Sequence, residues 1–260
     1  MHLHHQLGFA IALFIAALPL PEQTLAPIRN HCAISLNERG DQFSLQIGDP
    51  DCPDGHHCSS FGNESLSRFT GFNLADLDNE GARFTATLTA EAGAFSCTGT
   101  VHDRKLSGDS LFTPDSAFVD RMAKLGFTGF DSEKLQAYTF LDVTSDFARS
   151  LQQANIRGIT IDNLIALRIF KIDAAYAQSF PAMGYDQPDA DKLIALKIQG
   201  VNADEVKQIR ALGFQPSLDE LIQIRIFKIT PDFVQRMQNR GFKNLTIAKL
   251  VQIRIFKLAE

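Results

Sequence analysis

The stretch that decides the fold is residues 217–242, SLDELIQIRIFKITPDFVQRMQNRGF. Its first half opens with a capping box, because Ser217 is followed three residues later by Glu220. Its second half opens with Thr230 and Pro231, an N-cap and a residue suited to the first helical turn. It ends at Gly241, which can take the left-handed conformation that closes a helix. The stretch therefore predicts two short helices joined by a tight turn.

A competing interpretation exists for the first of these helices. Residues 222–226 alternate with period two, and their isoleucines favour strands. The capping box and the helical spacing of Leu221, Ile224 and Ile226-Phe227 favour a helix instead.

The same pattern recurs five times between residues 113 and 260, in steps of 28 or 29 residues. A helix-stop residue followed by an apolar one recurs at Gly126-Phe127, Asn155-Ile156, Gly184-Tyr185, Gly213-Phe214 and Gly241-Phe242. A leucine keeps the same register at Leu135, Leu164, Leu193, Leu221 and Leu250. Two landmarks with one period predict a supersecondary unit stacked on copies of itself.

The predicted units are helical hairpins at about 113–141, 142–170, 171–199, 200–228 and 229–260. The first helix of the first unit is expected to open at Thr113-Pro114-Asp115. The other second-helix caps are expected at Ser132 or Asp131, Thr160, Asp189 and Thr246. Two aromatic ladders are expected in the core: Phe118, Phe147, Tyr176 and Phe233, interrupted by Glu205, and Phe170, Phe227 and Phe256, with Leu141 and Gln199 as variants.

The amino-terminal residues 1–26 resemble a secretory signal peptide. The apolar run from Leu7 to Leu18 is too short to span a bilayer, and cleavage is expected after Ala26 or Ala17. No later segment is expected to cross a membrane. The sequence thus predicts a periplasmic or secreted protein.

Residues 27–112 form a second region with short alternating runs at 32–36, 43–47, 84–88 and 95–101. These runs predict a small antiparallel β domain. All four cysteines lie here, and an even number in an exported chain predicts disulfides. Three connectivities are possible; Cys52–Cys58 with Cys32–Cys97 is favoured. The predicted fold class is α+β, with this β domain followed by a solenoid-like αα-hairpin repeat domain.

Charge also divides the chain. Residues 27–112 carry 12 acids and 6 bases, a net charge of −6, whereas residues 113–260 carry 17 acids and 19 bases, a net charge of +2. The sequence lacks a strongly basic face, so it gives no reason to expect nucleic-acid binding. Seven basic residues recur on the second helices as a candidate binding stripe: Arg168, Lys171, Lys197, Arg225, Lys228, Arg254 and Lys257. They either complement the negative ends of helices or bind an anionic partner, a protein or an envelope component.

Catalytic signals are weak. Gly108-Asp109-Ser110-Leu111 matches the serine-esterase tetrapeptide, but no histidine follows His102 to serve as the base. A loop holds Asp51, Asp54, His56 and His57, which are metal-ligand types, but a disulfide-closed surface loop explains the same residues equally well. We therefore predict no catalytic residue, no cofactor and no metal.

The unit resembles the repeats found C-terminal to bacterial bla-regulator-type membrane metallopeptidases. The residues that carry this resemblance are 230–242 and 164–172, and residues 92–99 and 108–114 resemble the β segment that precedes such repeats. The peptidase domain itself is missing from this sequence, so peptidase activity is not implied. The resemblance implies an extracytoplasmic sensor-like or interaction module.

The sequence as a whole predicts a non-catalytic exported interaction module that binds its partner through the repeats. The alternatives are a β domain that binds a small molecule or metal, with the repeats as scaffold, and a hydrolase.

Overall fold

The computed structural model describes residues 25–48, 58–64 and 66–258. Residues 1–24 of the predicted signal peptide lie outside these residues, and so do Cys52 and the loop with Asp51, Asp54, His56 and His57.

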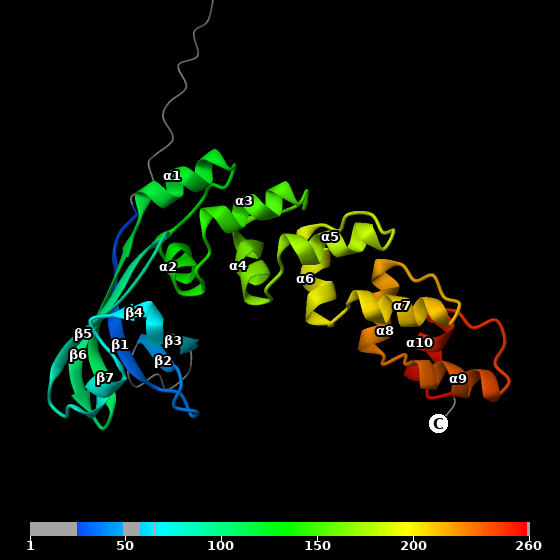
Figure 1. Ribbon diagram of the computed structural model, residues 1–260, viewed down its shortest axis with the longest axis horizontal. Helices are drawn as coiled ribbons and strands as arrows, with labels where there is room; N and C mark the ends of the chain where they lie inside the picture. The colour runs from blue at the N-terminus through cyan, green and yellow to red at the C-terminus, as the bar shows by residue number, and fades with distance from the viewer. Residues whose placement is uncertain (1–24, 49–57, 65, 259–260) are drawn as a thin grey trace, which may run out of the picture.

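The amino-terminal domain is one antiparallel sheet (Figure 1). Its strands are β1 (Ile28–Leu36), β2 (Phe43–Gly48), β3 (Cys58–Glu64), β4 (Phe69–Thr70), β5 (Arg83–Ala90), β6 (Gly93–His102) and β7 (Lys105–Pro114), in the order β3-β2-β1-β7-β6-β5-β4. Two 3-10 turns, η1 (Leu66–Arg68) and η2 (Leu74–Asp78), flank β4. The four expected strands are confirmed as β1, β2, β5 and β6, and the sheet contains three more.

The sheet curls into a half-barrel around β7. Cys32 on β1 and Cys97 on β6 form a disulfide, although β7 lies between these two strands. The bond passes the point where Gly108 of β7 pairs with Cys32 on one side and Gly99 on the other. A Cβ at Gly108 would lie 2.1 Å from the Thr98 carbonyl oxygen, so only glycine permits this close approach. The favoured Cys32–Cys97 pairing is therefore confirmed.

Ten helices follow in the described residues, and they form five hairpins. They are α1 (Ser116–Lys124), α2 (Ser132–Leu141), α3 (Ser145–Gln153), α4 (Ile161–Ile169), α5 (Ala174–Ala182), α6 (Ala190–Ile198), α7 (Ala203–Ala211), α8 (Leu218–Ile226), α9 (Pro231–Asn239) and α10 (Ile247–Ile255). We call the odd-numbered ones first helices and the even-numbered ones second helices. The isoleucine run 222–226 lies in α8 and is helical, which confirms the helix over the strand.

Helix starts and stops follow the predicted period, with one correction. The stop residues Gly126, Asn155, Gly184, Gly213 and Gly241 all have positive φ, from 58° to 88°. The second-helix caps are Asp131, Thr160, Asp189, Ser217 and Thr246. The expected start at Thr113 is wrong: Thr113 and Pro114 end β7, and Asp115 caps α1 instead. The ladder pairing of β7 with β6 competes with helix initiation and wins.

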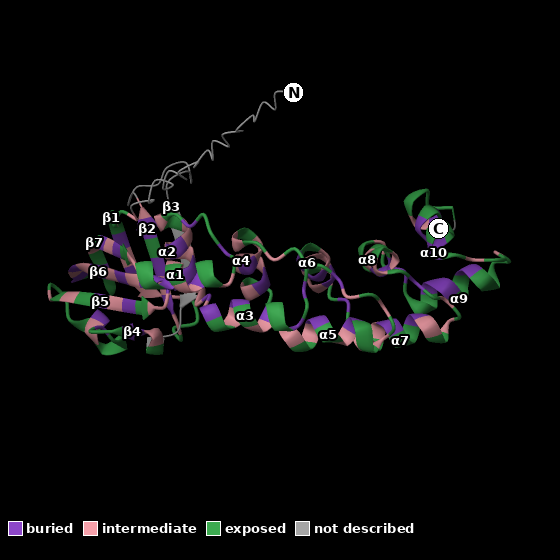
Figure 2. Cartoon of the chain, turned by 90° about the horizontal axis from the view of Figure 1, so that it is seen from above, coloured by how far each residue is buried: buried purple, intermediate pink, exposed green. Residues whose placement is uncertain are grey.

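The hairpins stack into an arc, with the second helices along its inner side (Figure 1). Each second helix contacts the next, from α2 to α10, and the two kinds of helix form separate rows when seen from above (Figure 2). The recurring leucines Leu135, Leu164, Leu193, Leu221 and Leu250 are all buried in this stack. No described helix has both the length and the apolar character needed to cross a bilayer.

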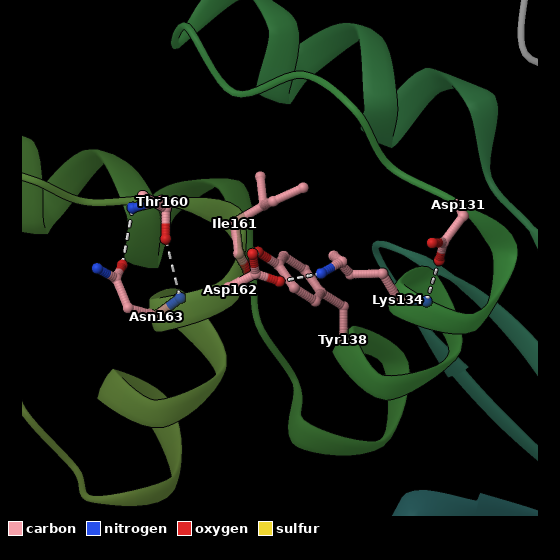
Figure 3. A network of polar contacts seen from close by, with 7 residues as sticks. All are labelled: Asp131, Lys134, Tyr138, Thr160, Ile161, Asp162 and Asn163. Atoms are coloured by element: carbon pink, nitrogen blue, oxygen red, sulfur yellow. Dashed lines mark hydrogen bonds and ion pairs between the residues drawn. The ribbon is translucent and has the colours of Figure 1, made fainter.

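Figure 3 shows how two successive units are joined at α2 and α4. The Tyr138 hydroxyl donates to the Ile161 carbonyl oxygen at 2.7 Å, and Lys134 forms an ion pair with Asp162. Burial, with the Asp162 charge adding to it, raises the pKa of the Tyr138 hydroxyl, so this group stays a neutral donor. The unit interface is thus apolar inside and hydrogen-bonded at its edge.

We expect the double substitution Cys32→Ala/Cys97→Ala to lower the free energy of unfolding of the β domain by about 4 kcal/mol, since the bond closes a loop with a sequence separation of 65. Urea unfolding followed by circular dichroism measures this. The control is Ser35→Ala/Ser107→Ala, which changes two small strand residues and leaves the bond intact. A loss below about 1 kcal/mol would show that the bond does not hold the curl.

Candidate partner-binding surface on the second helices

The predicted basic stripe contains two groups, of which the first is Arg168, Lys197, Arg225 and Arg254. Three members of this group lie over the aromatic ladder of the first helices. Arg254 Cζ lies 3.9 Å from the ring centroid of Phe233, and Lys197 Nζ lies 4.3 Å from that of Tyr176. Arg168 lies over Phe147 in the same way, at 5.5 Å. These are cation–π contacts within single units. Burial raises the pKa of Tyr176 to about 12, so the ring under Lys197 is a neutral phenol.

The three arginines of this group also bond to the preceding unit. Arg168 Nε donates to the Leu141 carbonyl oxygen at 3.1 Å. Arg225 Nε donates to that of Gln199 at 2.6 Å, and Arg254 Nη2 to that of Lys228 at 3.2 Å. These acceptors lie at the end of the previous second helix, where carbonyls lack helical partners. The arginines thus complement helix ends, but those of the neighbouring unit rather than their own.

The fourth unit replaces the aromatic residue by Glu205. Arg225 Nη1 lies 3.2 Å from Glu205 Oε1, so an ion pair stands where the second, third and fifth units have a cation–π contact. Glu205 Oε2 is buried and has no hydrogen-bond partner among the described residues. Burial raises the pKa of this carboxyl, and the Arg225 charge and hydrogen bond only partly oppose that shift.

A second group, Lys171, Lys228 and Lys257, directly follows the C-caps of α4, α8 and α10. Each lysine is exposed and has a left-handed backbone, with φ of 52°, 51° and 50°. The same position holds Asp142 at 54° in the first unit and Gly200 at 72° in the third. In the described part of the chain, no ion pair engages these three ammonium groups. Sequence reasoning found the stop residues of the first helices but missed this second left-handed series, because lysine does not signal it.

Beside these lysines runs a row of exposed isoleucines, one in each of the last four units. Ile169, Ile198 and Ile226 are each 52% exposed, and Ile255 is 53% exposed. We call these four residues the isoleucine row. In the first unit the equivalent residue is Phe140, which is buried against Phe95 of β6 with ring centroids 5.0 Å apart.

The second aromatic ladder was expected in the core, and this is wrong for two members. Phe170 and Phe256 are 36% and 66% exposed, while Phe227 is half-buried. These residues are the C-caps of α4, α10 and α8, so they lie past the last helical turn that packs on the neighbouring unit. They add apolar area beside the isoleucine row.

The other two candidate sites, the esterase-like tetrapeptide and an open cavity, give weaker support for a function. Ser110 of the esterase-like tetrapeptide is buried in β7, and its hydroxyl donates to the Asn30 carbonyl oxygen at 3.1 Å, which assigns it a structural role. An open cavity of about 380 Å³ lies between the β5–β6 turn and the start of α1. Its lining includes Asp115, whose carboxylate already accepts from the Phe118 amide as the helix cap.

Comparison with known proteins gives no relative: no protein-family model, curated protein or solved structure matches this chain. The resemblance to metallopeptidase-associated repeats therefore stays a prediction.

We expect Glu205→Phe to raise the free energy of unfolding by about 1 kcal/mol, because it restores the cation–π contact under Arg225 and removes a buried unpaired oxygen. Thermal unfolding by circular dichroism measures the gain, with Gln208→Phe on the exposed face of α7 as the control. A destabilised variant would mean that the ion pair is worth more than the aromatic contact.

The gain should also depend on pH. A carboxyl whose pKa is raised in the folded state favours folding when protonated, and this contribution is lost as the pH rises through the folded pKa. The advantage of Glu205→Phe over the wild type should therefore grow as the pH rises past about 4.3, the ordinary pKa of glutamate. An advantage that shrinks over this range would contradict the burial argument.

Proposed function

We propose that this protein is a non-catalytic, exported interaction or sensor-like module that binds a protein partner on the second helices. The observation that carries the proposal is the isoleucine row. Its members occupy one equivalent position in four successive units and are each about half exposed. Scattered exposed apolar residues need no explanation, but a regular series along the second helices of a solenoid matches the extended surfaces through which such arrays bind.

The three lysines support the same surface. A left-handed backbone costs a non-glycine residue roughly 1–2 kcal/mol, and glycine would avoid this cost, as Gly200 does in the third unit. A lysine at such a position is explained if its ammonium group takes part in binding. Lys171, Lys228 and Lys257 each follow a C-cap beside the isoleucine row, so they would hold carboxylates of a partner there.

Two observations support export. The Cys32–Cys97 disulfide fits an oxidising compartment, and the apolar run from Leu7 to Leu18 is typical of a signal peptide. Leu25 packs against the core, and the Ala26 carbonyl oxygen accepts a 2.7 Å hydrogen bond from the Ser132 hydroxyl. Cleavage after Ala26 would remove both contacts, so of the two expected sites we favour Ala17.

Amino-terminal sequencing of the protein purified from cells tests this. We expect a mature chain that begins at Leu18 and retains Leu25 and Ala26. Retention of Met1 together with a reduced Cys32–Cys97 pair would contradict export.

Capture experiments test the binding surface. We expect Ile198→Ser/Ile226→Ser/Ile255→Ser to reduce capture of the partner from envelope extract at least tenfold, because half-exposed apolar side chains each add binding energy when covered. Lys171→Ser/Lys228→Ser/Lys257→Ser should do the same at low salt. The matched control is Lys105→Ser/Lys207→Ser/Lys243→Ser, three exposed lysines elsewhere. Circular dichroism must show that each variant folds; undiminished capture by folded variants would reject the surface.

A further inference from the structure

The chemistry of this surface restricts the kind of partner, if the proposed function holds. The isoleucine row is apolar, and Phe170 and Phe256 widen it in the second and fifth units. Three cations flank it: Lys171, Lys228 and Lys257. The four other cations of the predicted stripe contact aromatic rings, the Glu205 carboxylate or backbone carbonyls of this chain. A bare polyanion would meet only the three lysines and leave the isoleucines uncovered.

A membrane surface is also a poor fit. The second helices lie on the inner side of the arc, and a flat lipid surface cannot cover a concave one (Figure 1). A narrow polymer that follows the curve can reach every unit. A polypeptide provides both apolar side chains for the isoleucines and carboxylates for the lysines.

The repeat spacing then selects the conformation of that polypeptide. Packed helices lie roughly 8–10 Å apart, so consecutive members of the isoleucine row should be about that distance apart. An extended polyproline II chain returns to the same face every three residues, which is about 9 Å. An α-helix returns to the same face after about 5.4 Å, or about 11 Å for two turns, and both distances fit this spacing less well.

We therefore propose that units two to five bind an extended acidic segment of another protein, with an apolar residue at every third position and carboxylates between. Each apolar side chain would cover one isoleucine. The carboxylates would face Lys171, Lys228 and Lys257, and the missing cation at Gly200 leaves the third unit neutral at this position.

The test is selection from a library of random peptides of about 12 residues, a length that spans four units at about 3.1 Å per residue. The full chain with its disulfide intact is the target. Ile198→Ser/Ile226→Ser/Ile255→Ser is the parallel target. We expect enrichment, on the wild type alone, of net negative peptides with apolar residues three apart. No enrichment, equal enrichment on the variant, neutral or basic peptides, or amphipathic peptides with apolar residues seven apart would each overturn the proposal.

A selected peptide then tests the charges. Its dissociation constant, measured by fluorescence anisotropy, should rise at least tenfold for Lys171→Ser/Lys228→Ser/Lys257→Ser at about 0.05 M salt and far less at about 0.5 M, because screening removes the attraction. The variant Lys105→Ser/Lys207→Ser/Lys243→Ser should bind as the wild type does. Equal effects of both lysine variants would overturn the role of the three lysines.

Vesicles of phosphatidylglycerol and phosphatidylcholine give the remaining comparison. Cosedimentation of the chain that depends on the isoleucine row would assign the surface to lipid and overturn the peptide proposal.

The proposed function and this inference can fail separately. Row-dependent capture of an envelope protein together with enrichment of helical peptides would keep the function and reject the extended segment, whereas capture that ignores the row would reject both.

Discussion

The structure of the repeat region depends on contact between neighbouring units. Nine of the ten described helices are nine residues long, and isolated helices of this length are marginal in water. A hairpin of two such helices cannot bury its own apolar face. The leucine series supplies the apolar contact between units. Arginines stabilise the edge of the same interface: the Arg254 guanidinium contacts an aromatic ring of its own unit and donates to a carbonyl oxygen of the previous unit. Stability is therefore a property of the stack.

The β domain replaces the missing neighbour at the start of the stack. In α2, Thr139 stands where later units have the basic residue, and Phe140 stands where they have the exposed isoleucine. Arg68 from η1 donates to the Thr139 carbonyl oxygen at 2.8 Å and also to that of Phe140, so the sheet domain is hydrogen-bonded to the end of α2. Phe140 packs on Phe95 of β6. One helix position thus docks a folded sheet in the first unit and is left exposed in the others.

The periodic features were predictable from sequence, and the non-periodic ones were not. A glycine at a helix stop needs only its own backbone freedom, so Gly126 and its equivalents could be recognised one unit at a time. The Cys32–Cys97 pair was one choice among several, and its position across β7 depends on Gly99 and Gly108, whose role only strand pairing reveals. The error at Thr113 has the same origin: Thr-Pro-Asp begins a helix when free, but here its first two residues pair with β6.

The sequence predicted part of the candidate surface, but it did so from the basic residues and not from the exposed isoleucines. Recurrence at equivalent repeat positions grouped seven basic residues, but sequence position alone does not separate a cation that faces solvent from one that caps a neighbour. Arg254 and Lys257 are three residues apart; the first lies 3.9 Å from the Phe233 ring centroid, and the second follows the helix end with its side chain in solvent. The distinguishing features are conformational: a left-handed lysine where glycine would cost less, and an isoleucine that stays half exposed in unit after unit. Both depart from what stability alone would select, and such departures are expected where a protein binds something else.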